Sequence, residues 1–262
     1  MNRREFIIGL AAATPALALG GLSGCAHAPY TQRSQFILLS RSQENTLGQE
    51  AAQDILKKEK QATDSRYVDP VRRCGKRIAD ASAEPDFDWE FHVIDAPDTV
   101  NAFALPGGKV FVYTGLFTLT ATEPELATVI AHEAGHVIAR HGAERMSLGV
   151  IAQLGQQVAG TLLGAGTSPT MQAFMVAYGV GANVGVILPF SRTQEYEADR
   201  IGLILMAKAG YDPEVALEFW AKMAAKSKDA PPEYLSTHPS DENRIAAIKE
   251  LLPEAKSYYR PR

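Results

Sequence analysis

Apolar side chains recur every three or four positions through most of the chain, which is the period of an amphipathic helix. The pattern is clear over residues 44–62 and 70–82, and it continues in most of the segment from residue 115 to residue 252. No internal repeat divides the chain into similar units. We therefore expect one mainly helical domain of the α+β class.

Three short stretches depart from the helical period and have the composition of strands. Residues 89–94 alternate apolar and polar side chains, as a half-buried strand does. Residues 101–105 are apolar, the turn-forming Pro-Gly-Gly of 106–108 follows, and residues 109–113 have the composition of a returning strand. The sequence therefore predicts a small antiparallel sheet, formed as a hairpin or a meander.

The N-terminal region has the order of a secretory signal peptide. Residues 1–4 are short and positively charged, residues 6–22 are apolar, and small residues follow. We expect residues 1–24 to be removed as the signal peptide. Residues 25–41 would then form a lipidated cysteine and a tether, and residues 42–262 the folded domain.

Cys25 is the predicted lipidation site. The segment 22–25, Leu-Ser-Gly-Cys, resembles a bacterial lipobox, in which the cysteine becomes the lipidated first residue of the mature chain. The alternative is an ordinary signal peptide with a chance cysteine. Ala26 follows, not the aspartate that retains lipoproteins in the inner membrane of enteric-type bacteria. We therefore expect a periplasmic protein that is anchored by lipid to the outer membrane.

Composition excludes several classes of protein. Of the 262 residues, 46% are hydrophobic and 21% are charged, which is ordinary for a folded globular chain. A net charge of −4 does not suit a nucleic-acid-binding protein, because phosphate binding needs a positive surface. The two cysteines, Cys25 and Cys74, cannot form a disulfide scaffold, so we expect Cys74 to be a buried, unreactive thiol.

The strongest chemical signal is the H-E-x-x-H motif that begins at His132. Thr122 is a good helix cap and Gly142 is placed to stop the helix, so the motif is expected on a helix between them. His132 and His136 are four residues apart, and both imidazoles then project from one helix face. Two neutral imidazoles suit zinc, and Glu133 beside them is a ready general base for water bound to the metal. The alternative is a pair of histidines that only make core hydrogen bonds.

A second helix supplies the third metal ligand that a catalytic zinc needs. Residues 192–209 are expected to be helical, which places Glu195 and Asp199 one turn apart on one face. Glu195 is the candidate ligand, and Asp199 would accept a hydrogen bond from a ligand imidazole. A solvated surface helix with three acids is the alternative, but residues 201–206 are largely apolar. Glu197 falls off the shared face, so we expect it to be solvated.

His238 is a further candidate for the site. It precedes Pro239, which holds its backbone extended. It is suited either to stabilise an oxyanion or to occupy the fourth position of the zinc in a resting state. Arg244 would assist it at the substrate or oxyanion, or simply pair with an acid. We expect His92 and His141 to be structural or solvated.

These motifs together resemble peptidase family M48, the gluzincin metalloproteases. The H-E-x-x-H helix is followed by E-x-x-A-D at 195–199. Residues 101–108 resemble the family's sheet segment before the active-site helix, and Thr-His-Pro at 237–239 with Arg244 resembles its C-terminal motif. The resemblance covers about residues 40–252 and implies a zincin-like domain with the small antiparallel sheet beside the H-E-x-x-H helix. Because the body of the chain has no apolar stretch long enough to span a bilayer, it is similar to the periplasmic lipoprotein branch.

The resemblance implies zinc-dependent endoproteolysis. One Zn²⁺ per chain would be held by His132, His136 and Glu195, and Glu133 would move the proton of the attacking water. Residues 102–112 would either offer an edge strand to an extended substrate or form a merely structural hairpin.

The function we expect is degradation of damaged or misassembled proteins of the bacterial cell envelope. Its partners would be polypeptide substrates, the membrane through the lipid anchor, and envelope-assembly proteins. The alternative is a chaperone-like assembly factor or binding module with a residual metal site, although the intact Glu133 argues against it. A purely structural zinc site is a third reading, but such sites are usually closed and rich in cysteine.

Overall fold

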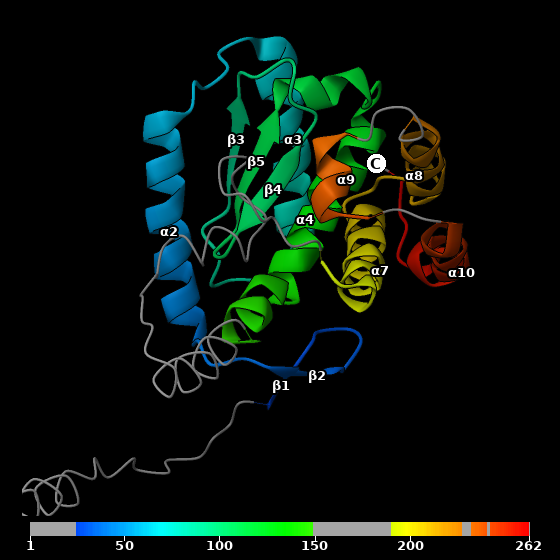
Figure 1. Ribbon diagram of the computed structural model, residues 1–262. Coiled ribbons are helices and arrows are strands. Elements are labelled where there is room, and N and C mark those ends of the chain that lie inside the picture. The colour runs from blue at the N-terminus through cyan, green and yellow to red at the C-terminus, as the bar shows by residue number, and fades with distance from the viewer. Residues whose placement is uncertain (1–24, 149–189, 227–231, 240–241, 262) are drawn as a thin grey trace, which may run out of the picture.

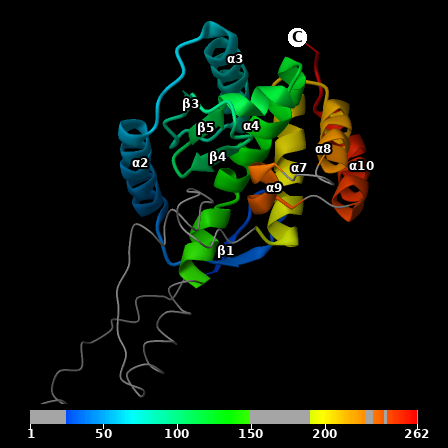
Figure 2. The same ribbon diagram turned by 45° about the horizontal axis from the view of Figure 1, so that its top comes forward.

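The computed structural model describes residues 25–148, 190–226, 232–239 and 242–261. Helices cover both faces of a small central sheet, and further helices extend the molecule on one side (Figures 1 and 2). The elements in chain order are β1 (Cys25–His27), β2 (Ser34–Phe36), α2 (Arg41–Lys58), α3 (Ser65–Ser82), β3 (Glu90–Ile94), β4 (Ala102–Leu105), β5 (Lys109–Tyr113), the 3₁₀ helix η1 (Thr114–Thr118), α4 (Glu123–Ile138), α7 (Arg192–Lys208), α8 (Glu214–Lys226), α9 (Glu233–Thr237) and α10 (Glu242–Ser257). The α+β class predicted from the sequence is confirmed.

The first two long helices begin earlier than the apolar pattern predicts. The side chain of Ser40 caps α2 in a reciprocal capping box with Gln43, and the side chain of Asp64 caps α3. These polar caps satisfy backbone N–H groups that the first helical turn leaves unpaired. They lie just upstream of the apolar repeat, so the repeat alone misses the first turns of both helices.

The predicted antiparallel hairpin is present, but the three-stranded sheet as a whole is mixed and not antiparallel throughout. β4 and β5 do form an antiparallel hairpin, with Phe103 opposite Phe111. β3, however, pairs with β5 in parallel, so the strand order is β3–β5–β4. Residues 95–101 carry the chain from one edge of the sheet to the other, and the hairpin then returns β5 to the centre.

Side chains of the central strand alternate between two apolar layers. Val110 and Val112 belong to the larger core, which includes side chains of α3, α4 and α7. Phe111 belongs to a smaller core on the other face, where it joins Phe103 and Ile55 of α2. Both faces of the sheet are therefore buried, which explains why β4 and β5 are apolar almost throughout.

α4 begins as predicted but ends early. Thr122 caps the helix as predicted, and it does so in a reciprocal capping box with Glu125. Gly142 does not stop the helix; the break comes before it, where Arg140 adopts a left-handed backbone with φ of +57°. Helical structure resumes over 141–148. This break turns the chain directly after α4, and it sets the direction in which His141 points.

α4 and α7 pack closely because two glycines face the neighbouring backbone. A Cβ built on Gly135 would lie 2.7 Å from the carbonyl oxygen of Ala198, and one built on Gly202 would lie 3.1 Å from the carbonyl oxygen of Ala131. Any larger side chain would separate the helices. The close approach brings the two histidines of α4 next to the first turn of α7.

The segment expected to be a tether is folded from Cys25 onward. β1 and β2 form an antiparallel hairpin that lies across the ends of α4 and α7 (Figure 1). Gln35 is buried and donates a hydrogen bond of 2.7 Å to the carbonyl of Ala139, and Arg200 donates to the carbonyl of Tyr30. The hairpin is therefore a packed part of the domain.

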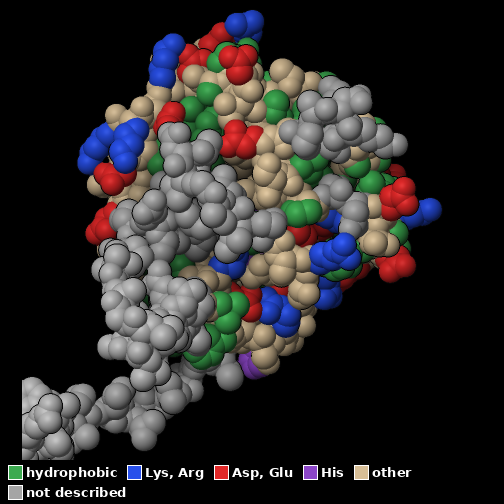
Figure 3. Space-filling view, in the orientation of Figure 1, with side chains coloured by type: hydrophobic (Ala, Val, Ile, Leu, Met, Phe, Trp, Pro, Cys, Tyr) green, Lys and Arg blue, Asp and Glu red, His purple; other side chains and the backbone are tan. Residues whose placement is uncertain are grey.

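Basic and acidic side chains are interspersed over the described part of the face in Figure 3. None of the described helices has the length and apolar character that a bilayer crossing requires. The expected signal peptide at 1–24 lies outside the described residues, as does the glycine-rich segment 155–185.

Candidate metal centre

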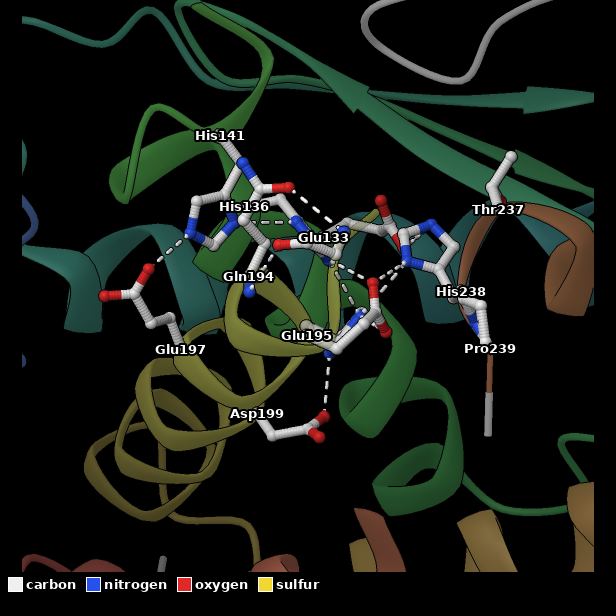
Figure 4. Close-up of polar contacts among 12 residues, drawn as sticks. Glu133, His136, His141, Gln194, Glu195, Glu197, Asp199, Thr237, His238 and Pro239 are labelled. Carbon is white, nitrogen blue, oxygen red and sulfur yellow. Dashed lines mark hydrogen bonds and ion pairs between the residues drawn. The ribbon is translucent and has the colours of Figure 1, made fainter. Parts of the chain in front are cut away.

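Four buried side chains offer ligand atoms to one point. His132 and His136 come from α4, Glu195 from the first turn of α7, and His238 from the residue after α9. One ligand atom from each lies within 4.8 Å of the others, and every one of these residues is at most 4% exposed. The close-up in Figure 4 shows three of them, His136, Glu195 and His238, turned toward one another.

The spacing of these atoms fits a tetrahedral metal ion. Metal–ligand bonds of about 2.0–2.1 Å require ligand atoms about 3.3–3.4 Å apart at the corners of a tetrahedron. Nε2 of His132 lies 3.0 Å from Nε2 of His136 and 3.3 Å from Nδ1 of His238. Oε1 of Glu195 lies 3.1 Å from Nδ1 of His238 and 3.3 Å from Nε2 of His136. Imidazole nitrogens and a carboxylate in this arrangement are the ligand set of a metal centre.

Glu133 lies beside the ligands without belonging to them. Its Oε1 accepts a hydrogen bond of 2.7 Å from the hydroxyl of Tyr234 and lies 3.4 Å from Nε2 of His238. Burial and the Glu133 carboxylate raise the pKa of Tyr234 well above its usual range, so the phenol keeps its proton. Sequence reasoning missed Tyr234, which is placed by tertiary contacts: its backbone N–H donates to the carbonyl of Val100 and its ring stacks on Trp220 of α8.

Asp199 accepts a hydrogen bond from His132, as predicted from the one-turn spacing. Nδ1 of His132 lies 3.0 Å from Oδ1 of Asp199. Arg244 binds the same carboxylate through two hydrogen bonds of 2.7 and 2.8 Å, and its Nη1 also lies 2.7 Å from Oε2 of Glu195. Its guanidinium stacks on Trp220, 4.0 Å from the ring centre. Of the two roles considered for Arg244, the structure shows the pairing with acids.

Burial and charge prepare these groups for a cation. Burial lowers the pKa of His136 well below its usual value, which leaves the ring neutral. Burial alone would raise the pKa of Glu195, but the charge of Arg244 and the hydrogen bonds from His132 and His136 outweigh it and lower that pKa. For His132, burial and Arg244 lower the pKa, whereas Asp199 and Glu195 raise it to a net value of about 9. A metal ion would therefore compete with a proton for Nε2 of His132.

Glu197 is buried, which corrects the expectation that it is solvated. Only 4% of the residue is exposed, and its carboxylate accepts hydrogen bonds from His141 and Arg33. Burial alone would raise its pKa, but the hydrogen bonds from His141, Thr31 and Arg33 outweigh it and lower the pKa to about 2. Position on the helical wheel did not reveal this contact, because its partners lie on other segments.

The chain is similar to known metallopeptidases. Residues 66–252, more than half of the chain, match the model of peptidase family M48. The chain is 37% identical over 235 residues to the mitochondrial metalloendopeptidase OMA1 of Schizosaccharomyces pombe, a match covering 88% of this chain and 67% of the relative. It is 38% identical over 206 residues to OMA1 of Arabidopsis thaliana, covering 78% of this chain and 40% of the relative.

A bacterial relative matches at similar length. The chain is 32% identical over 234 residues to the beta-barrel assembly-enhancing protease of Yersinia pestis, covering 84% of this chain but 46% of the relative. The family match includes both metal-ligand helices and the segment that carries His238. The chain therefore belongs to peptidase family M48 and is a metalloendopeptidase.

Proposed function

We propose that the protein is a zinc-dependent endopeptidase that degrades damaged or misassembled proteins of a bacterial cell envelope. The observation that carries the proposal is a buried set of three imidazoles and one carboxylate with a further carboxylate, that of Glu133, beside it. Nitrogen-rich tetrahedral sites favour zinc. A binding module has no need of a general base next to its metal, which argues against the assembly-factor alternative.

Each side chain of the site would have a separate role in peptide hydrolysis. Bound zinc would supply Lewis acidity to the scissile carbonyl and to the attacking water. His132, His136 and Glu195 would hold the metal, and Asp199 would orient His132 through its Nδ1–H. Glu133 would take the proton of the water and deliver it to the leaving amine. Tyr234 would keep Glu133 in position through the 2.7 Å hydrogen bond.

We further propose that His238 closes the fourth ligand position in the resting enzyme. The proposal is supported by its Nδ1, which lies 3.3 Å from Nε2 of His132 and 3.1 Å from Oε1 of Glu195. Displacement by substrate would then open the site. His238→Ala should keep zinc and raise basal cleavage or self-cleavage. If His238 instead stabilises an oxyanion, the variant should keep zinc and lose about 2–4 kcal/mol of transition-state stabilisation.

The edge of the sheet is the proposed place for an extended substrate. β4 is an edge strand in the order β3–β5–β4 and packs against α4, which carries the two ligand histidines. Pairing with the backbone of β4 would hold a peptide without reading its sequence. A structural hairpin is the competing interpretation, and it predicts that β4 variants alter stability but not the KM for peptides.

The envelope location rests on Cys25 and on the bacterial relative. That relative is named a beta-barrel assembly-enhancing protease, and a lipid on Cys25, with Ala26 after it, would anchor this chain to the outer membrane of a bacterial cell. Mass spectrometry of the membrane fraction should find a lipidated N-terminal Cys25. A mature chain that begins elsewhere and is removed by salt would refute the anchor.

Degradation of casein by purified protein tests the activity. Cleavage should stop with a chelator and return on addition of zinc. Full activity in the chelator would exclude the proposed zinc enzyme, whereas zinc binding without cleavage of any unfolded protein would favour the assembly factor.

A further inference from the structure

A second buried network lies behind His136, on the side of the ring away from the metal ligands. Nδ1 of His136 lies 2.9 Å from Nδ1 of His141, and Nε2 of His141 lies 3.1 Å from Oε2 of Glu197. Figure 4 shows this line of contacts from Glu197 through His141 to His136. His141 is completely buried and Glu197 is 4% exposed, so water does not substitute for either partner.

The chemistry of these groups fixes where the protons lie. An ionised carboxylate only accepts hydrogen bonds, so Nε2 of His141 must donate to Glu197. A neutral His141 then presents a lone pair at Nδ1, and Nδ1 of His136 donates to it. The lone pair of His136 is thereby left on Nε2, which is the atom that lies among the ligands, 3.0 Å from Nε2 of His132. Glu197 thus determines the tautomer of both rings.

The N-terminal hairpin holds Glu197 in place. In the loop between β1 and β2, Arg33 donates through Nε to Oε2 of Glu197 at 2.7 Å, and the hydroxyl of Thr31 donates to Oε1. The remaining nitrogens of Arg33 bind both oxygens of Glu144 at 2.6 and 2.7 Å. Arg33 therefore joins the two acids, and the hairpin is connected to the metal centre through Glu197 and His141.

The two ligand histidines are supported in different ways. His132 donates directly to the carboxylate of Asp199, whereas the carboxylate nearest His136 is reached through an intervening ring. We propose that His141 and Glu197 are positioning residues for the ligand His136, and that Arg33 of the N-terminal hairpin completes this support. The inference rests on the metal site of the proposed function.

The test measures metal binding rather than activity. Zinc affinity would be determined by competition with a chromophoric chelator at fixed pH. The variants are His141→Phe, which removes the acceptor for His136, and Glu197→Ala, which removes the carboxylate. Each should weaken zinc binding about 10–100-fold, the usual loss when a partner of a ligand histidine is removed. The visible spectrum of the cobalt-substituted variants should also change, because the ring of His136 is no longer held.

Two isosteric variants separate positioning from general stability. Glu197→Gln keeps the volume and an oxygen acceptor, so it should restore much of the affinity lost in Glu197→Ala, and it answers the question if His141→Phe does not fold. Glu90→Gln is the control, because Glu90 is half-buried on β3 and its carboxylate binds Lys109 at 2.7 Å, away from this network. It should lower the thermal midpoint and leave zinc affinity within about twofold.

Folded Glu197→Ala with wild-type zinc affinity and an unchanged cobalt spectrum would overturn the inference. Equal loss of affinity in Glu90→Gln and Glu197→Ala would also overturn it, because the effect would then be one of general stability. A wild-type protein that binds no zinc is a different result, since it would refute the proposed zinc site itself.

Discussion

Glu133 lies between two buried side chains, Tyr234 and His238, that affect its ability to accept a proton. The Tyr234 hydroxyl donates to its Oε1 at 2.7 Å, and Nε2 of His238 lies 3.4 Å from the same oxygen. The ring of Tyr234 stacks on that of His238, with 4.5 Å between the ring centres. Glu133 must be ionised to accept a proton, and in a dry site a charged acceptor depends strongly on its donors.

Tyr234→Phe removes this donor and keeps the aromatic ring. A hydrogen bond to a charged group contributes about 1.5–3 kcal/mol, so we expect kcat to fall about 10–100-fold. KM and metal content should hardly change, because the phenol touches no metal ligand through its oxygen. Tyr67→Phe on α3 is the control and should have wild-type kinetics. Equal kcat in the two variants would show that Tyr234 does not support the base.

The reactivity of the Cys74 thiol on α3 is a measure of how tightly the larger core is packed. The residue is completely buried, and burial raises the pKa of its thiol to about 12. In a Cys25→Ser variant, which leaves Cys74 as the single thiol, a thiol reagent at pH 8 should label the protein only after unfolding, because the thiolate is the reactive form. Rapid labelling of the native protein would contradict this packing.

Sequence patterns predicted the residues whose partners follow from helical spacing. His132 and His136 share a helix face, and so do Glu195 and Asp199. The burial of Cys74 was also predicted correctly. Glu197 was assigned wrongly because its partners His141 and Arg33 come from distant segments, and nothing in the spacing of one helix reveals them.

At the scale of elements, the metal ligands meet because α4 and α7 approach closely at Gly135 and Gly202. Gly135 lies within the H-E-x-x-H motif itself, next to His136, and faces the backbone of Ala198. Ala198 and Glu195 lie on the same helix, α7, so this contact also fixes the distance of Glu195 from α4. A change in the spacing of the two helices therefore changes the distance between the ligands.

Gly135→Ala should weaken metal binding and destabilise the domain. The new Cβ would lie 2.7 Å from a carbonyl oxygen, and overpacking of this kind costs about 1–3 kcal/mol. Better helix propensity offsets at most about 1 kcal/mol of that loss. Gly202→Ala, with 3.1 Å to the facing backbone, should have a smaller effect in chemical denaturation. Stabilisation by Gly135→Ala with unchanged metal affinity would disprove the close-packing argument.

The boundaries of elements were predicted only where a local signal fixes them. The capping boxes of Thr122 and Ser191 start α4 and α7 at the expected residues, and Gly210 with φ of +83° follows the end of α7 as expected. The predicted end of α4 was wrong, because the residue with a left-handed backbone is Arg140 and not a glycine. Arg140 is held there by its contacts with Glu44 and the carbonyl of Leu39, which are tertiary.

For the whole molecule, a bound metal would join segments that are far apart in the sequence. The ligands come from α4, α7 and the residue after α9, so the ion would cross-link the helices around the larger core. A ligand that binds only the folded state stabilises it in proportion to the logarithm of its concentration over Kd. Metal binding should therefore contribute to the global stability of the domain.

Removal of the metal should lower the thermal midpoint. At a zinc concentration 100 times Kd the stabilisation is about 2.7 kcal/mol, or about 5–10 °C for a domain of this size. Calorimetry with and without a chelator measures the difference, and addition of excess zinc should reverse it. A midpoint that does not depend on zinc would mean that no ion joins these helices in the folded state.

The way in which the elements are arranged in the whole chain was harder to predict than the elements themselves. Strand composition identified the three strands but not the order β3–β5–β4, which depends on how residues 95–101 cross the sheet. The N-terminal segment was expected to be a tether, since its few apolar residues give no helical repeat. It folds because Arg33 binds Glu197 on α7 and Gln35 binds the carbonyl of Ala139 just after α4. These partners lie far away in the sequence, so the sequence pattern does not predict the contacts.

The proposed role of Glu133 is to move the proton of the attacking water while the neighbouring residues hold a metal. Metal content and casein cleavage of Glu133→Gln, measured on the same sample as the wild type, test it most directly. The substitution keeps every ligand and removes the base, so the variant should hold as much zinc as the wild type while its cleavage rate falls about 10²–10⁴-fold. A variant with full zinc that cleaves casein at the wild-type rate would refute this role of Glu133.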